Sequence, residues 1–243
     1  MTSNITKVLL DKISTSIEGG APKYHQKLQD QNKMFVRDRI DYLLDPNSFV
    51  EDGLLARSLD DLPADAVITG YGKIDGRPVA IIANDMTVKA GTWGRVTYQK
   101  MTHTQLRADK MGIPIIYLVD SAGARLDEQQ YCYAGRNAMG NIFHNQIQIS
   151  GRVPQVCVLF GPSPAGSAYV PALCDITIMV DKNVSAYLGS PRMAEMVIGE
   201  DVTLEQMGGA RMHCVQSGLG DALVKNDVLN AIFQLGWQVV VYR

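Results

Sequence analysis

Hydrophobic and polar residues follow a helical period near the start of this chain and a strand period soon after it. A first helical segment is followed by residues 24–44, where spaced apolar residues among charges predict one helix that ends at Asp45-Pro46-Asn47. After a polar stretch at 56–66, the β-rich runs 67–72 and 78–83 flank Asp75-Gly76. That dipeptide is typical of a tight turn, so these runs predict a hairpin.

The second part of the chain alternates helices with wholly apolar strands. Strands are expected at 113–119, 156–160 and 176–180. Helices are expected at 96–111, 128–149 and 165–173, after Pro191 and Thr203, and at 227–238. Strands that are apolar on both faces are typical of a parallel sheet between helical layers, and they predict an α/β fold.

Composition narrows the class of protein. The 243 residues are 46% hydrophobic and 20% charged with a net charge of -2, which favours one large globular domain and gives no reason to expect nucleic acid or a membrane as partner. Apolar runs are shorter than the roughly 20 residues that span a bilayer, and no signal peptide is apparent. The four cysteines form no CxxC pair. We therefore expect no metal site, a reducing compartment and a cytoplasmic location.

Two loops rich in small residues follow the apolar strands. Residues 120–125 (DSAGAR) come directly after one strand, and 161–168 (GPSPAGSA) come after the next. Ligands of open α/β sheets bind at the carboxyl ends of strands, where helix starts offer unpaired N–H groups. Two such loops facing one another would hold a developing oxyanion. The alternative is that both are tight connections whose glycines serve only their backbone angles, and spacing alone does not decide between the two.

Five stretches follow one another along the chain as recognisable motifs. They are 34–50 (MFVRDRIDYLLDPNSFV), 84–94 (NDMTVKAGTWG), 116–129 (IYLVDSAGARLDEQ), 161–175 (GPSPAGSAYVPALCD) and 203–221 (TLEQMGGARMHCVQSGLGD). In this order they resemble the carboxyltransferase β-subunit family of propionyl-CoA, methylcrotonyl-CoA and related acyl-CoA carboxylases. The resemblance covers about residues 34–235, and the ordered set is far more specific than any one stretch.

The resemblance implies a crotonase-like (ClpP/crotonase) α/β fold with parallel sheet layers flanked by helices. The family has two homologous domains, and this chain resembles the first. We expect a helical extension at 1–33 and the N-terminal, acyl-CoA-binding carboxyltransferase domain at 34–243.

The implied activity is transfer of carboxylate from carboxybiotin to the α-carbon, or vinylogous carbon, of a short-chain acyl-CoA. Biotin on a separate carrier is the implied cofactor, and CoA is part of the substrate. The implied partners are a biotin carboxyl carrier, a biotin carboxylase and a complementary C-terminal carboxyltransferase domain in a homo- or hetero-oligomer. No side-chain base is implied, because the departing biotin takes the α-proton while backbone amides hold the thioester enolate.

The resemblance also carries site residues. The residues assigned to catalysis through their backbone amides are Gly123, Ala124, Gly166 and Ser167. Those assigned to substrate binding are Lys89, Gly91, Thr92, Gly94, Lys100, Ala122, Arg125, Ala165 and Ala168. Lys89 and Lys100 are candidates for the CoA phosphates, although surface lysines are more often simply solvated.

The chain also departs from the family pattern. Ala122 and Ser167 replace family glycines, which keeps the N–H donors but narrows the cleft. The resemblance extends to only the first of the family's two domains, and residues 236–243 differ from the family's usual sequence at this point. A non-catalytic half-subunit that binds CoA esters or aids assembly is therefore an alternative. A hydratase or thioester hydrolase ranks last, because these loops carry no clear pair of acid and base carboxylates.

Three other groups are weighed against structural roles. The adjacent His213 and Cys214 resemble a nucleophile pair, but on a strand their side chains point to opposite faces, which favours a structural role. His103 and His144 are expected to be ordinary helix residues. Glu128 is expected to interact with a helix dipole rather than act as a base.

Overall fold

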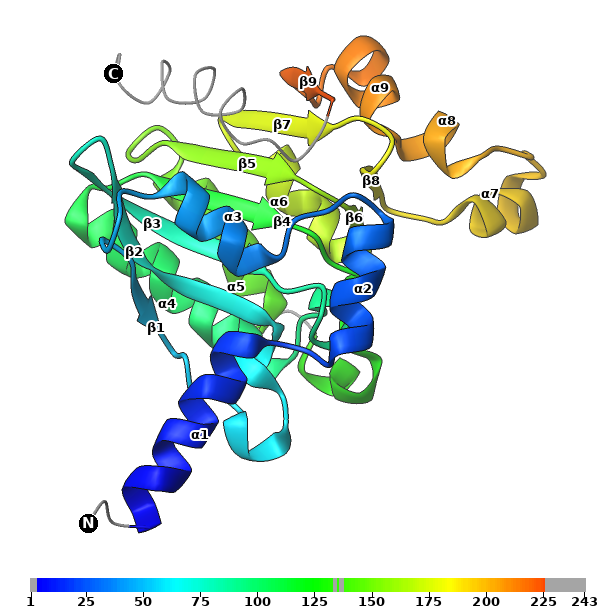
Figure 1. Ribbon diagram of the computed structural model, residues 1–243. Helices are drawn as coiled ribbons and strands as arrows, with labels where there is room; N and C mark the ends of the chain where they lie inside the picture. The colour runs from blue at the N-terminus through cyan, green and yellow to red at the C-terminus, as the bar shows by residue number, and fades with distance from the viewer. Residues whose placement is uncertain (1–3, 133–134, 136–137, 226–243) are drawn as a thin grey trace.

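A mostly parallel sheet forms the centre of the molecule in the computed structural model, which describes residues 4–132, 135 and 138–225 (Figure 1). Its seven strands have the order β1-β2-β3-β4-β5-β7-β9, and a second sheet pairs β6 with β8. The strands are β1 (Val50–Asp52), β2 (Val67–Ile74), β3 (Arg77–Asn84), β4 (Ile115–Val119), β5 (Gln155–Leu159), β6 (Pro162–Pro164), β7 (Ile176–Val180), β8 (Ser185–Tyr187) and β9 (Ala222–Val224).

Helices and short turns connect these strands. The α-helices are α1 (Asn4–Glu18), α2 (Pro22–Asp30), α3 (Val36–Leu43), α4 (Arg95–Met111), α5 (Met139–Ile149), α6 (Tyr169–Ala172), α7 (Pro191–Ile198), α8 (Leu204–Gly208) and α9 (Ala210–Met212). Tight 3-10 turns lie at Ser58–Asp60, Pro63–Ala66, Lys89–Gly91, Leu126–Tyr131 and Ala165–Ala168, and a π-helical turn lies at His213–Ser217.

The predicted hairpin and parallel sheet are confirmed. β2 and β3 pair antiparallel, and Asp75 and Gly76 between them have φ of 49° and 77°. Two positive φ angles are what a two-residue hairpin turn of the favoured hand requires. From β3 onward, neighbouring strands of the large sheet run parallel.

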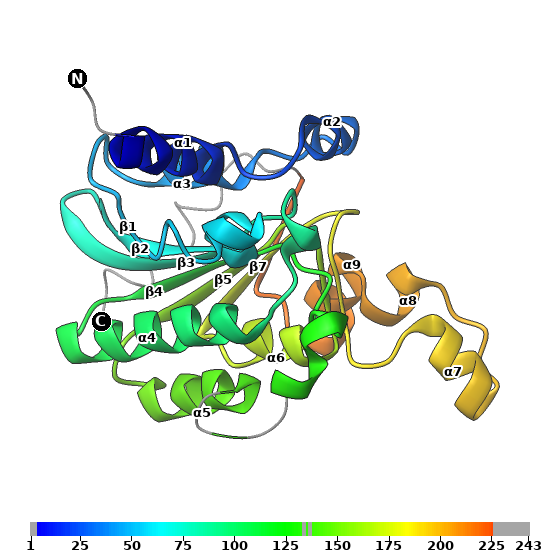
Figure 2. The ribbon, with the colours of Figure 1, turned by 90° about the horizontal axis from the view of Figure 1, so that it is seen from below.

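Helices cover both faces of the large sheet. Figure 2 shows α1, α2 and α3 on one face, with α4, α5 and α6 on the other, while α7, α8 and α9 extend from one end. β4 and β5 lie in the middle and are buried along their whole length, as their continuous apolar sequences predict. No helix in the described part of the chain has the length and apolarity needed to cross a membrane.

The expected helix at 24–44 is wrong in one respect, because it is broken in the middle. α2 ends at Asp30 and α3 begins at Val36, with Asn32 between them at a φ of 53°. The break turns Lys33 inward, where its Nζ donates to both oxygens of Asp120 at 3.0 and 3.1 Å. A buried ion pair with a residue 87 positions away prevails over local helical periodicity.

Two other expected elements also differ. The predicted helix at 128–149 is a 3-10 turn (Leu126–Tyr131) followed by α5, which begins only at Met139. His213 and Cys214 lie in the π-helical turn, not on a strand. The predicted helix at 227–238 and the tail at 236–243 lie outside the described residues.

Asp120 joins the N-terminal helices to the end of β4. Its side chain is fully buried and also lies 3.5 Å from Nη1 of Arg39, whose guanidinium stacks 4.0 Å from the ring centre of Phe160. Removing one partner from a buried ion cluster leaves the remaining charges uncompensated, which is strongly destabilising. The domain boundary after residue 33 stays a prediction, although Lys33 packs within the fold of the domain that follows.

Lys100 does not fit the expectation that it contacts CoA. It lies on α4 with a relative exposure of 9%, and its Nζ donates to the carbonyls of Ala64, at 2.7 Å, and of Val67. Burial lowers the pKa of Lys100 to about 8. The ammonium is therefore occupied inside the protein, where it supports the turn before β2.

That turn is strained. Ala64, Asp65 and Ala66 have φ of 48°, 53° and 63°, a left-handed run without a glycine. Each such residue costs about 1–3 kcal/mol unless the surroundings impose it. Lys100 imposes part of it, together with Thr97, whose Oγ1 donates to Asp65 Oδ2 at 2.7 Å.

The substitution Asp120→Asn is expected to lower the free energy of unfolding by about 3–5 kcal/mol, because it removes the buried carboxylate that accepts both hydrogen bonds from Lys33 Nζ. Urea unfolding followed by circular dichroism measures the loss. Asp181→Asn is the matched control, since it breaks an ion pair whose partner Arg211 is largely exposed, and it is expected to change little. Equal effects of the two variants would contradict the proposed role of Asp120.

The substitution Lys100→Met is expected to change how stability depends on pH. The pKa of Lys100 falls from 10.5 to about 8 on folding, so between these values the unfolded chain holds a proton that the folded chain has released. Stability from this group therefore rises with pH, by up to about 1.4 kcal/mol per pH unit. Urea titrations at several pH values from 7 to 10 measure the free energy of unfolding of both proteins. The wild-type value minus the variant value should rise above about pH 8. A constant gap would rule out the shifted pKa.

Candidate active site

The two loops rich in small residues lie side by side. Residues 120–125 (the first loop) and 161–168 (the second loop) follow β4 and β5, which are neighbouring parallel strands. Ser121 N donates to Pro162 O at 2.9 Å. A Cβ at Gly123, whose φ is 92°, would lie 3.2 Å from Pro164 Cγ. The fold thus brings the two predicted loops into contact at the carboxyl edge of the sheet.

Hydrogen bonds leave one N–H of residues 121–125, the part of the first loop that follows Asp120, without an acceptor among the described residues. The paired groups are Ser121 N with Pro162 O, Ala122 N with Ala90 O, Gly123 N with Ser121 Oγ, and Arg125 N with Trp93 O, all at 2.9–3.0 Å. Among the described residues, no acceptor pairs with Ala124 N, and Ala124 is only partly buried. Of the two predicted donors in this loop, Ala124 is thus the available one, while the Gly123 amide is used to shape the loop.

The second loop contains the 3-10 turn Ala165–Ala168. Ala165 opens it with a φ of 51°, and Ser167 Oγ donates to Pro164 O at 2.7 Å. The first N–H groups of such a turn have no partner within the turn, and Gly166 is among them. A Cβ at Gly166 would lie 2.7 Å from Met139 Sδ, so a side chain here would have to displace the flexible end of Met139 at the start of α5.

A cleft of about 930 Å³ opens beside the first loop. Its walls come from α1 and α2, the segments around residues 58–63 and 87–92, and the first loop. Five of the predicted residues line it: Lys89, Thr92, Ala122, Ala124 and Arg125. Within the described chain, Ala165, Gly166, Ser167 and Ala168 are not among the lining residues, so the second loop borders the first loop rather than the cleft. The volume is that of a typical small-molecule site.

Two lysines from different elements line this cleft. Lys12 of α1 lies 3.5 Å from Asp61, and Lys89 lies 3.7 Å from Asp127. Both carboxylates are well exposed to solvent, so these pairs are weak and the ammonium groups can rearrange toward an anionic ligand. Lys12 has no counterpart among the predicted residues.

Arg125 positions the loop and presents no free charge. Its side chain is buried, and Nη1 donates to Asp65 Oδ1 at 2.6 Å and to Glu128 Oε1 at 3.0 Å. Nη2 donates to Thr92 O at 3.0 Å. The predicted substrate contact of Arg125 is therefore confined to the part of its surface that borders the cleft.

Glu128 caps a helix, as expected, but the helix is α4. Its Oε2 accepts from Arg95 N, the first residue of α4, at 2.9 Å. Burial opposes ionisation, but hydrogen bonds from Arg95, Arg125 and Arg57 outweigh burial and lower the pKa of Glu128. The carboxylate stays ionised and paired, which does not suit a proton donor.

Gly91 and Gly94 allow the first loop to pack closely. Gly91 has a φ of 64°, and a Cβ on it would collide with Asp120 O. A Cβ on Gly94 would lie 2.5 Å from Arg125 Nη1. Both glycines therefore have a packing role, and contact with a ligand is not needed to explain them.

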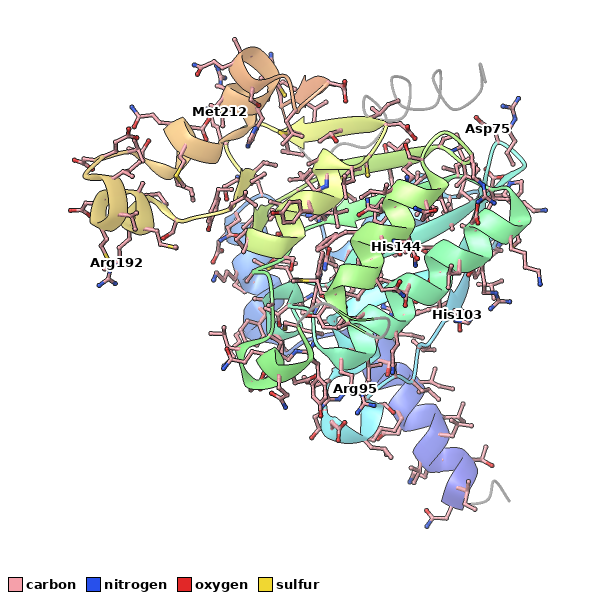
Figure 3. The ribbon with its side chains drawn as sticks, turned by 180° about the vertical axis from the view of Figure 1, so that it is seen from behind. Asp75, Arg95, His103, His144, Arg192 and Met212 are labelled. Atoms are coloured by element: carbon pink, nitrogen blue, oxygen red, sulfur yellow. The ribbon has the colours of Figure 1, made fainter. Side chains whose placement is uncertain are left out.

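The histidines have structural surroundings. His213 Nε2 lies 2.8 Å from Ala186 O, and Nδ1 lies 2.9 Å from Ser217 Oγ, so both ring nitrogens have partners. Figure 3 shows His103 on α4 and His144 on α5, at the surface of the helical layer. Neither residue is among those that line the cleft.

Sequence reasoning missed two parts of the site. One is the wall formed by α1 and α2, where the lining residues include Lys12, Thr15, Gly20 and Tyr24. The other is Asp65, which holds Arg125 from a position 60 residues earlier. Consecutive glycines at 19–20 and an aspartate among alanines at 64–66 are visible in the sequence, but neither signal is specific.

Comparison with known proteins agrees with this arrangement. The carboxyl transferase domain family matches residues 27–235. An uncharacterized carboxylase of Bacillus subtilis is 56% identical over 211 residues, covering 86% of this chain and 41% of its own length. The methylcrotonoyl-CoA carboxylase beta chain of Dictyostelium discoideum is 40% identical over 227 residues, covering 91% of this chain and 39% of its own length. The chain thus spans about two fifths of the curated relatives it matches.

Solved structures confirm the expected crotonase-like α/β fold. The transcarboxylase 12S structure, a hexamer assembly with hydrolysed methylmalonyl-coenzyme A bound, superposes with a TM-score of 0.84 at 33% identity over 93% of this chain and 46% of that one. The beta subunit of geranyl-CoA carboxylase from P. aeruginosa superposes with a TM-score of 0.79 at 28% identity, over 98% of this chain and 43% of that one. With the motifs, the two loops and the fold in agreement, the chain belongs to the carboxyl transferase domain family.

Proposed function

We propose that this chain is the acyl-CoA-binding part of a biotin-dependent carboxyltransferase. The CoA ester lies in the cleft beside the first loop, and its thioester oxygen accepts a hydrogen bond from Ala124 N. The observation that carries the proposal is that Ala124 N is the unpaired donor within residues 121–125, whose other amides are paired, and that Ala124 lines the cleft.

Such a donor stabilises the enolate through which the α-carbon becomes nucleophilic. Charge moves onto the thioester oxygen as the α-proton leaves, and a preorganised N–H is typically worth about 10²–10³ in rate. The carboxylates that line the cleft, Asp61 and Asp127, are exposed and each lies beside a lysine. This arrangement offers no desolvated base, which supports enolate stabilisation by the backbone over the hydratase or hydrolase alternative.

Biotin fits this chain only in part. Its ureido oxygen is a neutral acceptor, and a backbone N–H such as that of Gly166 suits it chemically. The second loop is open, with Ala165 exposed, so most of the enclosing surface has to come from elsewhere. When bound, carboxybiotin on its carrier would supply the carboxylate that the α-carbon of the thioester accepts, and the biotin nitrogen freed by breaking its N–C bond would take the α-proton.

The proposed partners follow from a biotin site that this chain encloses only in part. A complementary C-terminal carboxyltransferase domain on another polypeptide closes the biotin side, and a biotin carboxyl carrier and biotin carboxylase deliver carboxybiotin. The relatives' names support such an assembly, since one of them describes a hexamer. A homo- or hetero-oligomer is therefore part of the proposal, and the cytoplasmic location expected from the sequence stays a prediction.

One observation favours the second candidate, a non-catalytic half-subunit. The residues that line the cleft belong to the N-terminal helices, the segments around 58–63 and 87–92, and residues 122–127, and the second loop is not among them, so a CoA ester can bind without the surface that would hold biotin. Binding alone does not distinguish the two candidates, and only turnover in the assembled system does.

Lys12→Gln and Lys89→Gln are each expected to weaken CoA binding by about three- to tenfold, because each removes an ammonium that can meet a phosphate across the cleft. Isothermal calorimetry with CoA at two salt concentrations measures the effect, which should shrink at high salt. Lys110→Gln is the matched control, since Lys110 lies exposed at the end of α4 away from the lining residues. If all three variants bind CoA like wild type, the phosphates lie elsewhere.

The enzymatic test combines the purified chain with its complementary domain, a carboxylated biotin carrier and short-chain acyl-CoAs, with the carboxylated thioester detected by mass spectrometry. We expect product, and we expect Ala122→Trp to abolish it, because the exposed Ala122 side chain lines the cleft and bulk there displaces the ester. Gln130→Trp, exposed outside the cleft, should keep full activity. CoA binding without product from any acyl-CoA tested would favour the non-catalytic half-subunit instead.

A further inference from the structure

The direction of the Ala124 N–H is fixed by its own peptide group. In a planar trans peptide, the N–H points opposite to the preceding C=O. Gly123 O accepts from Trp93 N at 2.9 Å, so the Ala124 N–H points away from Trp93. Anything that holds the backbone of Trp93 therefore also holds the proposed oxyanion donor.

Arg125 holds this backbone twice. Its main-chain N donates to Trp93 O at 2.9 Å, and its guanidinium Nη2 donates to Thr92 O at 3.0 Å. Arg125 thus holds the isolated bridge between Trp93 and Ala124 through both its main chain and its guanidinium. Because an arginine side chain is long and flexible, the guanidinium can hold Thr92 O only if a further partner fixes it.

Asp65 fixes the guanidinium of Arg125. Its Oδ1 accepts from Arg125 Nη1 at 2.6 Å, and its main-chain oxygen lies 3.4 Å from Nη2. Its Oδ2 accepts from Thr97 Oγ1 at 2.7 Å. The carboxylate is completely buried, so neither bond competes with water.

The backbone around Asp65 is left-handed over three residues, and Lys100 braces it on both sides through Ala64 O and Val67 O. Strained backbone of this kind persists only where its surroundings impose it. The left-handed turn is the segment that presents the Asp65 carboxylate to Arg125.

We propose that Asp65 is a positioning residue for the reaction: through Arg125 and Trp93 it sets the orientation of the Ala124 amide that polarises the thioester. This inference rests on the proposed function of Ala124. Asp65 acts without touching substrate, so its loss alters the geometry of the donor more than the affinity of the cleft for CoA.

Infrared difference spectroscopy tests this on the full chain, using propionyl-CoA labelled with ¹³C at the thioester carbonyl. A hydrogen bond to the oxygen moves the carbonyl band to lower wavenumber. Wild type is expected to show this shift, and Asp65→Asn is expected to lose more than half of it, while CoA affinity measured by calorimetry stays near wild type. In the assembled enzyme, kcat should fall about 10- to 100-fold with little change in KM.

Two further variants keep the result interpretable. Asp181→Asn breaks an ion pair with Arg211 and should leave the band at its wild-type position. Thr97→Val removes the hydroxyl that donates to Asp65 and accepts from Gly94 N, and it leaves the ion pair between Asp65 and Arg125 in place. It replaces Asp65→Asn in the test if that variant does not fold, and a smaller loss of the shift is expected from it.

The outcomes distinguish failure of the proposed function from failure of the positioning role of Asp65. No shift for wild type with bound ester refutes the proposed function and this inference with it. A wild-type shift that Asp65→Asn and Thr97→Val leave intact refutes the positioning role alone. A shift lost equally in Asp181→Asn also refutes it, because general destabilisation then explains the effect.

Discussion

Hydrogen bonding of the first loop is the constraint on which the site depends. Four of its five consecutive amides from residue 121 to 125 have acceptors, drawn from the second loop, from the turn at residue 90, from Trp93 and from the loop itself. A buried amide without an acceptor is costly, so a fold rarely leaves one unless a ligand or solvent completes it. Ala124 N is that exception, and it lies in the wall of the cleft.

Two buried aspartates provide the framework for this loop. Asp120 begins it and is held by Lys33 and Arg39, which fixes the N-terminal helices over the end of β4. Asp65 anchors Arg125 at its other end. Each carboxylate lies in a region of low dielectric and is stable there only because its partners are fixed. The loop therefore has a rigid start, a rigid end and one free donor between them.

Much of the fold was predictable, because it depends on local patterns. The hairpin at Asp75-Gly76 and the apolar strands β4, β5 and β7 follow from turn chemistry and burial, and the position of the two loops follows from parallel strand order. The break at Asn32 and the inward turn of Lys33 depend on a partner 87 residues away. Local periodicity contains no information about such a pair, and for the same reason Asp65 and the wall formed by α1 escaped prediction.

Lys100 shows the limit of carrying a role over from a family motif. A lysine at this place suggests a phosphate contact, yet its ammonium bonds two carbonyls inside the protein. Ala124 shows the opposite case, where the motif indicated a pair of donors and the hydrogen bonds reduce it to one. In both cases the decisive fact is which polar groups already have partners, and only coordinates reveal that.

The most direct measurement is an experimental structure of the chain with a non-hydrolysable acyl-CoA analogue bound. We expect the CoA moiety to lie in the cleft between α1 and the first loop, with the thioester carbonyl oxygen about 2.7–3.1 Å from Ala124 N. An analogue bound in that cleft with its carbonyl oxygen hydrogen-bonded to another group, or bound on another face of the molecule, would contradict it.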